Sequence, residues 1–365
     1  MKYVTKKYIM ELGGFGEYHL FAPGPIRIPD VIKRTFLVDP PYFTSEGFSD
    51  LIREIQPKLQ AVFNTRNLVL IGTGSGTLGM EMAVSNFFSE GDNVIVVDSG
   101  KYGTNWALMC ESYGLKVNWV SVKPGEPVSI ADIDDKFTND TIGIFVTHVE
   151  TTTGVLHPIK EISDKYKKKC LILVDAVSSL LTEPLCADDY DVVISASQKA
   201  ISIPPGLFFM SVSHDASTHY AAESSLPKFY FDVTNELLRL EKGITTFTPA
   251  SNLYLALNVA LDEILKYGVE NIIRGTGHIA AETRKHLSRD FDLFSNEPCN
   301  AVTACICTNS NLLIKRLYDE GIVVGSGVRE LSDKIFRVMH FGWDLSEKEL
   351  NSVIKSILIL HDPYP

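Results

Sequence analysis

The sequence has little of several features that would point to particular functions. None of its six cysteines forms a CxxC pair, and their spacings match no zinc-binding pattern. Its 34 lysines and arginines are outnumbered by 45 acidic residues, and the net charge of −11 argues against binding to nucleic acid or to an anionic membrane. No apolar run approaches the roughly 20 residues that span a bilayer. We therefore expect no metal site, no nucleic-acid partner and no membrane partner.

The start of the chain also lacks the apolar segment of a secretory signal peptide, since residues 1–13 read MKYVTKKYIMELG. Cysteines without an evident pairing pattern are typical of a reducing compartment. We expect them to be small buried hydrophobic residues. The sequence thus predicts a cytoplasmic protein.

Short apolar runs alternate with helical stretches through the first 250 of the 365 residues. These runs are at 68–71, 93–97, 116–120, 143–147, 170–174, 191–195 and 207–210. Strands that are apolar on both faces are typical of a mostly parallel sheet covered by helices on each side. The alternation therefore predicts an α/β fold.

The pattern changes after about residue 250, where two long helices are expected at 252–267 and 269–287. Alternating strand patterns follow near 301–307, 322–324 and 335–339, and a last helix at 346–360 would be capped by Ser346 and Glu349. We expect an N-terminal segment at 1–20, a large domain at 21–255 and a smaller α+β domain at 256–365.

A glycine-rich turn follows the first of these strands. Gly74, Gly76 and Gly79 match G-x-G-x-x-G, and Asp98 ends the next strand 19 residues later. This spacing fits a dinucleotide-binding fingerprint, so a nicotinamide-dependent dehydrogenase is one alternative. The physical basis is broader, because free N–H groups at a helix N-terminus bind any phosphate. Hydroxyls at Ser75 and Thr77 would suit a terminal phosphate.

Two further strand ends carry Asp175 and the pair Gln198-Lys199. In a doubly wound sheet, ligands bind beyond the carboxyl ends of the strands, where both could face the glycine-rich turn. A lysine amine, an acid for a pyridine nitrogen and a phosphate site are the parts that pyridoxal 5′-phosphate (PLP) requires. Burial beside an apolar strand would lower the pKa of Lys199 and help it act as a nucleophile and base.

Several ordered motifs carry a resemblance to a known family. They are APGP at 22–25, TGSGT at 73–77, GKYG at 100–103, THVETTTG at 147–154, VDAVSS at 174–179, SASQKA at 195–200, PPG at 204–206, TP at 248–249 and FRV at 336–338. From about Phe21 to the C-terminus the chain resembles the class V (fold type I) PLP-dependent aminotransferases, the group of alanine–glyoxylate, serine–pyruvate and 2-aminoethylphosphonate–pyruvate aminotransferases. The resemblance implies a mostly parallel seven-stranded sheet in the large domain.

The resemblance also implies roles for individual residues. Lys199 would form the Schiff base and Asp175 would pair with the pyridine nitrogen. The other implied cofactor residues are Ser75, Gly76, Thr77 and Gln198 at the phosphate, Tyr102 and Val177 on the two ring faces, Thr151 near the 3-hydroxyl group, and Thr248 from the neighbouring subunit. Arg337 would bind the substrate carboxylate, as a planar fork can, and Gly24 would line the substrate side. A homodimer with shared active sites follows.

The implied reaction is ping-pong transfer, through pyridoxamine phosphate, of an amino group. The donor would be a small amino acid or 2-aminoethylphosphonate-like amine, and the acceptor a small 2-oxo acid such as pyruvate or glyoxylate. Alternatives are a PLP-dependent lyase or desulfurase, the dehydrogenase, and a non-catalytic binding module. The chain departs from the family at Tyr42-Phe43-Thr44, which lines the substrate entrance in relatives, and at His340. We expect His340 and His148 to be packed structural residues.

Overall fold

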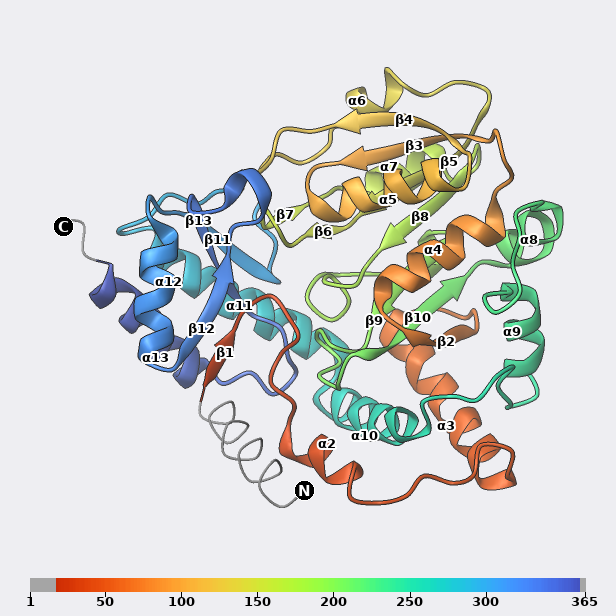
Figure 1. The fold of residues 1–365 in the computed structure, drawn as a ribbon, viewed down its shortest axis with the longest axis horizontal. Coiled ribbons are helices and arrows are strands. Elements are labelled where there is room, and N and C mark those ends of the chain that lie inside the picture. The colour runs from red at the N-terminus through yellow and green to blue at the C-terminus, as the bar shows by residue number, and fades with distance from the viewer. Residues whose placement is uncertain (1–17, 362–365) are drawn as a thin grey trace, which may run out of the picture.

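The large sheet brings the carboxyl ends of its parallel strands to one edge. The computed structural model describes residues 18–361 and shows two lobes, of which the larger surrounds this sheet (Figure 1). In the order of the sheet, the strands are β2 (Val69–Gly74), β10 (Gly206–Val212), β9 (Val192–Ala196), β8 (Leu171–Asp175), β5 (Thr141–Thr147), β3 (Asn93–Asp98) and β4 (Lys116–Ser121). β10 runs antiparallel to both neighbours, whereas the other pairs are parallel. The mostly parallel seven-stranded sheet is confirmed.

Helices cover both faces of this sheet because successive side chains of a strand point to opposite sides. In β3, Val94 and Val96 belong to one buried core, and Ile95 and Val97 belong to the other. The helices α4 (Gly76–Phe87) and α5 (Lys101–Ser112) pack on the first face, and α3 (Glu46–Phe63), α7 (Ile159–Tyr166) and α10 (Ser251–Tyr267) pack on the second. The large lobe also contains α2 (Asp30–Thr35), α6 (Ile130–Asp134), η1 (Ala187–Asp189), the π-helical turn η2 (Ala216–Tyr220), α8 (Ala221–Glu223) and α9 (Val233–Leu240).

The small lobe contains a four-stranded sheet whose first strand comes from the beginning of the described chain. In the order of the sheet, the strands are β1 (His19–Phe21), β12 (Ile322–Ser326), β13 (Ile335–Met339) and β11 (Val302–Ile306). Its helices are α11 (Val269–Leu287), α12 (Ser310–Asp319), η3 (Arg329–Leu331) and α13 (Glu347–Leu360). Figure 1 shows β1 beside β12, although the two strands are about 300 residues apart in the sequence. The expected boundaries at residues 20 and 255 stay predictions: β1 spans the first, and α10 spans the second. Residues 1–17 of the expected N-terminal segment lie outside the described residues.

The last helix begins where the capping pattern placed it. The hydroxyl oxygen of Ser346 accepts a hydrogen bond from the backbone N–H of Glu349 at 3.3 Å. The Glu349 carboxylate contacts Nδ1 of His19 at 2.7 Å, and an ion pair joins Arg27 to Asp344 at 3.0 Å. These two contacts join β1 and the segment after it to the small lobe.

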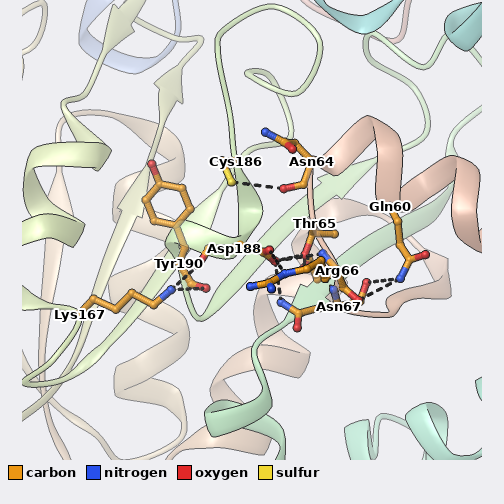
Figure 2. Close-up of polar contacts among 10 residues, drawn as sticks. Gln60, Asn64, Thr65, Arg66, Asn67, Lys167, Cys186, Asp188 and Tyr190 are labelled. Atoms are coloured by element: carbon orange, nitrogen blue, oxygen red, sulfur yellow. Dashed lines mark hydrogen bonds and ion pairs between the residues drawn. The ribbon is translucent and has the colours of Figure 1, made fainter.

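A polar cluster joins two loops at the far edge of the large sheet, away from the carboxyl ends of the strands (Figure 2). The Asp188 carboxylate accepts a hydrogen bond from Thr65 Oγ1 at 2.6 Å, and Lys167 Nζ donates to the Asp188 carbonyl at 2.6 Å. Cys186 Sγ donates to the Asn64 carbonyl at 3.4 Å. The cluster therefore holds the start of β2 against the loop before β9. Within residues 18–361, no helix is long and apolar enough to cross a membrane.

Candidate active site

A cavity at the carboxyl edge of the large sheet collects most of the expected cofactor residues. It lies where α4 begins after β2, where Asp175 ends β8 and where Lys199 follows β9. It is lined by Ser75, Gly76, Thr77, Met80, Tyr102, Val149, Asp175, Val177, Ser178, Gln198 and Lys199. The expectation had not included Met80, Val149 and Ser178. Val149 and Ser178 lie within the motifs at 147–154 and 174–179, and a helical turn brings Met80 in line with Gly76 and Thr77.

Lys199 is almost completely buried, with 6% of its surface exposed. Burial lowers the pKa of its amine to about 8, and the positive charge of Arg337 acts in the same direction. The carboxylates of Asp175 and Glu150 oppose that shift. Near neutral pH the amine can therefore exist in both its neutral and its charged form, as a nucleophile that also carries protons requires.

Asp175 lies in the same cavity and is 4% exposed. Burial raises the pKa of its carboxyl group to about 7, although the backbone N–H of Val177 donates to Oδ1 at 2.9 Å. The negative charge of Glu150 also raises this pKa, and the positive charge of Lys199 lowers it. A buried carboxyl group with this pKa becomes an ionised partner as soon as a cation binds beside it.

The first turn of α4 lines the same cavity as Lys199 and Asp175. The hydroxyl of Ser75, at the N-cap position, makes no capping hydrogen bond, so it does not occupy the N–H groups of the first turn. A Cβ atom at Gly76 would lie 2.6 Å from Cγ2 of Val177, so glycine is needed for this close approach. Oε1 of Gln198 is buried without a hydrogen-bond partner. The N–H groups of this turn are therefore available to donate hydrogen bonds to an anion.

Glu150 is a buried residue beside the cavity for which no role is expected from the sequence. It is fully buried, and its Oε2 accepts hydrogen bonds from the backbone N–H groups of Tyr102 at 2.9 Å and Gly103 at 3.4 Å, in the first turn of α5. Its Oε1 accepts from the backbone N–H of Thr152 at 3.1 Å. Glu150 follows Val149 in β6 (Val149–Glu150), which pairs with β7 (Val155–Leu156). This carboxylate therefore fixes the backbone of Tyr102, whose ring lines the cavity.

Arg337 lies in β13 of the small lobe and is 7% exposed. It is not among the residues that line the cavity, although its charge acts on the Lys199 amine. Nε and Nη2 donate to the Ser326 carbonyl at 3.0 and 2.7 Å, and Nη1 donates to the Thr151 carbonyl at 2.6 Å. Two of the five N–H groups of a guanidinium are not used by these bonds. Thr151 therefore contacts the arginine through its backbone and is not among the residues that line the cavity.

Comparisons with known proteins agree with this geometry. Residues 42–330 match the family model described as Aminotransferase class-V. The chain belongs to this family. It is 32% identical over 354 residues to the small subunit of a soluble hydrogenase from Synechococcus sp., covering 93% of this chain and 91% of that protein. It is 29% identical over 343 residues to the serine–glyoxylate aminotransferase of Hyphomicrobium methylovorum, covering 89% and 85%.

A solved structure, the alanine–glyoxylate aminotransferase from Nostoc sp., is similar to this aminotransferase with a TM-score of 0.90. The two chains are 25% identical, and the match covers 94% of this chain and 95% of that one. The fold type I architecture is therefore shown. Arg337 lies beyond the residues that the family model matches, and the structural likeness extends the comparison over most of the small lobe.

The order of strands in the large sheet excludes a dinucleotide-binding role for the glycine-rich motif at Gly74, Gly76 and Gly79. In that fingerprint, the strands on either side of the glycine-rich helix are neighbours, so the acidic residue lies beside the turn. Here β2 and β3 are separated in the sheet by β10, β9, β8 and β5. Asp98 instead accepts a hydrogen bond from Thr104 at 2.9 Å and lies outside the cavity that holds Ser75.

Two other expected residues lie outside the cofactor cavity of their own chain. Thr248 lies on a different surface of the large lobe, in a depression shared with Tyr230 and Phe247. Gly24 lies directly against the Lys199 side chain, because a Cβ atom at this position would be 2.8 Å from Nζ. The roles of both residues stay predictions.

The histidines near the site are packed residues. Burial lowers the pKa of His148 to about 3 and that of His340 to about 4. Nδ1 of His340 contacts the Asn300 carbonyl at 2.9 Å.

Among residues 18–361, no group of three or more His, Cys, Asp and Glu side chains could hold a metal ion. Of the six cysteines, none lines the cavity, so the mobile nucleophile of a desulfurase has no counterpart there.

Proposed function

We propose that this aminotransferase binds PLP and moves an amino group from a small amino acid to a small 2-oxo acid such as pyruvate or glyoxylate. One observation carries the proposal: the Lys199 amine, the Asp175 carboxyl group and the first turn of α4 share one cavity. When bound, PLP supplies an aldehyde carbon that takes up the amino group and an electron-withdrawing ring, so that two substrates can react in turn.

The groups in the cavity fit the three parts of this cofactor. Lys199 would hold the aldehyde carbon and Asp175 the pyridine nitrogen, whose positive charge would keep the buried carboxylate ionised. The first-turn N–H groups of α4 would hold the phosphate. Oε1 of Gln198, a cavity residue, is buried without a hydrogen-bond partner and supports this assignment, because exchange of the amide N and O positions would replace this acceptor with a donor group.

The remaining residues would act on the substrate and on protons. Lys199 Nζ, with a pKa lowered to about 8 by burial, can take a proton from the substrate Cα and return it. The two unused N–H groups of Arg337 would bind the substrate carboxylate. This favours an amino acid over a 2-aminoethylphosphonate-like donor. Relatives named serine–glyoxylate and alanine–glyoxylate aminotransferases support glyoxylate as an acceptor.

We also propose a homodimer in which Thr248 reaches the phosphate site of the partner subunit. Phe247, beside Thr248, stacks on Tyr230 with ring centroids 4.4 Å apart, and the nearby Phe229 is 82% exposed. Such an aromatic surface on a water-exposed face is typical of a protein interface.

The cytoplasmic location expected from the cysteines, all of which are free thiols, is part of the same proposal.

The first experiment is an absorption spectrum of the purified protein in the near-ultraviolet and visible range. We expect a yellow band from the lysine-bound cofactor in the wild type and in Lys168→Ala, which removes an exposed lysine. The band should be absent from Lys199→Ala. Serine, alanine and aspartate are then added one at a time, followed by pyruvate or glyoxylate.

A donor that bleaches the band, together with an acceptor that restores it, would identify both substrates and establish two half-reactions. A colourless protein that cannot be reconstituted with PLP would overturn the proposal. A band that no amino donor changes would favour a binding module. Release of sulfide or of another product from the donor, without transfer to an acceptor, would favour a lyase.

A further inference from the structure

The surroundings of the Lys199 amine contain two groups that the proposed reaction does not use. Nζ donates a hydrogen bond to the Pro23 carbonyl, in the segment that follows β1. Nζ also lies over the ring of Phe341, which follows β13, at 5.1 Å from the ring centroid. Phe341 is 1% exposed, so water does not separate the ring from its surroundings. A lysine of the large lobe is therefore contacted by two groups from outside that lobe's sheet.

The close approach of Pro23 depends on glycines on both sides of it. Gly24 has a φ of +94°, and a Cβ atom there would lie 2.8 Å from Nζ and 3.0 Å from Cδ of Lys199. A Cβ atom at Gly325, in β12, would lie 2.5 Å from Cδ of Pro23. Pro23 is thus packed between β12 of the small sheet and the Lys199 side chain.

Both groups favour the charged form of the amine. A carbonyl oxygen accepts a stronger hydrogen bond from an ammonium than from a neutral amine. The negative face of an aromatic ring attracts a cation within about 6 Å, most strongly where water is excluded. The other charged groups around the amine are Arg337, which favours the neutral form, and Asp175 and Glu150, which favour the charged form.

We propose that Phe341 is a positioning residue for Lys199, whose ring face and the Pro23 carbonyl together bind the lysine ammonium whenever the amine is not bonded to the cofactor. The catalytic part of this role rests on the proposed function. The contact itself belongs to the cofactor-free chain. Without the ring, burial and Arg337 would keep the amine neutral over a wider pH range, and Lys199 would hold its proton less well.

The experiment measures the titration of Lys199 in cofactor-free protein. Cyanate, which reacts only with neutral amines, is added between about pH 6 and 10, a range that brackets the titration of a perturbed lysine. Carbamylation of Lys199 is followed by mass spectrometry. We expect Phe341→Leu to lower the midpoint pH by roughly half a unit to one unit, from the usual strength of a partly buried cation–π contact.

Phe336→Leu is the matched control. Phe336 is a fully buried phenylalanine of β13 that packs on Phe291, with ring centroids 4.9 Å apart. We expect a similar loss of stability and no change in the Lys199 midpoint. If Phe341→Leu does not fold, mono-, di- and trifluorophenylalanine at position 341 keep the ring's shape while weakening its negative face, and the midpoint should fall in that order.

An unchanged midpoint in Phe341→Leu or across the fluorinated series would overturn the proposal, as would equal shifts in Phe341→Leu and Phe336→Leu. Because cyanate needs no cofactor, the result is separable from the proposed function. Failure of the protein to bind PLP would contradict the proposed function. The titration of Lys199 would still decide the role of Phe341.

Discussion

At the scale of single residues, the site holds charges that oppose folding. Asp175 is almost fully buried, and its nearest hydrogen bond comes from one backbone N–H. Burial raises the pKa of Asp175 to about 7, from an ordinary value of 3.8. Folding therefore takes up a proton between about pH 4 and 7. The stability that Asp175 contributes below this window falls as the pH rises through it and is lost above it.

We therefore predict that Asp175→Asn stabilises the cofactor-free protein. At about pH 8 the variant should gain roughly 2–4 kcal/mol in the free energy of unfolding, while at about pH 4 the difference should nearly vanish. Urea unfolding of both proteins at the two pH values checks this. The same variant should bind PLP more weakly. Equal stability of the two proteins at pH 8 would contradict the prediction, because it would show that burial of the ionised Asp175 carboxylate does not destabilise the folded chain.

We expect substrate binding to depend on the planar shape of the Arg337 guanidinium as well as on its charge. We predict that Arg337→Lys raises KM for the 2-oxo acid roughly 10- to 100-fold, because an ammonium cannot present two parallel N–H donors. Steady-state kinetics with pyruvate and glyoxylate measure it. Arg284→Lys is the control, since Arg284 is a partly buried arginine that also donates to a backbone carbonyl, that of Cys299. An effect of equal size in the control would assign the change to packing.

At the scale of secondary-structure elements, the start of α5 depends on one buried carboxylate. Glu150 accepts from two N–H groups of the first turn and from Thr152. Burial raises the pKa of Glu150, and these hydrogen bonds oppose the shift. Because Tyr102 lies in that turn, the capping contact also sets where its ring meets the cavity.

Glu150→Gln should therefore change both stability and cofactor binding. Its amide would present a donor where two donors already point, so we expect a loss of about 1–3 kcal/mol and weaker binding of PLP. The control is Glu183→Gln, because Glu183 is another buried carboxylate, bound by Asn300. It should lose stability and keep its PLP affinity. Urea unfolding and PLP titration separate the two effects.

The elements also show what the sequence could and could not predict. The sequence shows the strand near 93–97 because four adjacent apolar residues, at 94–97, are buried on both faces, and β3 begins at Asn93 as expected. Helix α3 was missed, since Pro57 interrupts an otherwise helical pattern. Lys199 and Asp175 were found because strand ends mark ligand sites. Phe341 was not, because its contact with Lys199 joins residues 142 positions apart, and no local pattern encodes such a contact.

At the scale of the whole molecule, the exposed aromatic surface around Phe247 predicts self-association. Phe247→Asp should yield a monomer in sedimentation experiments and weaken PLP binding, because it would remove Thr248 of one subunit from the site of the other. The control is Leu312→Asp, on a half-exposed helix position of the small lobe, which should leave the oligomeric state unchanged. A wild type that sediments as a monomer at all concentrations would contradict the proposed dimer.

The pairing of β1 with β12 has a consequence for how the protein is made. His19 lies opposite Ile322, so the ribosome must add about 300 residues after β1 before its partner strand exists. At ordinary rates of synthesis, this interval is roughly 15–60 s. During that time the large sheet can form from its own strands, but the Pro23 carbonyl cannot reach its place over Lys199. The nascent chain therefore completes the surroundings of Lys199 only after β12 has been translated.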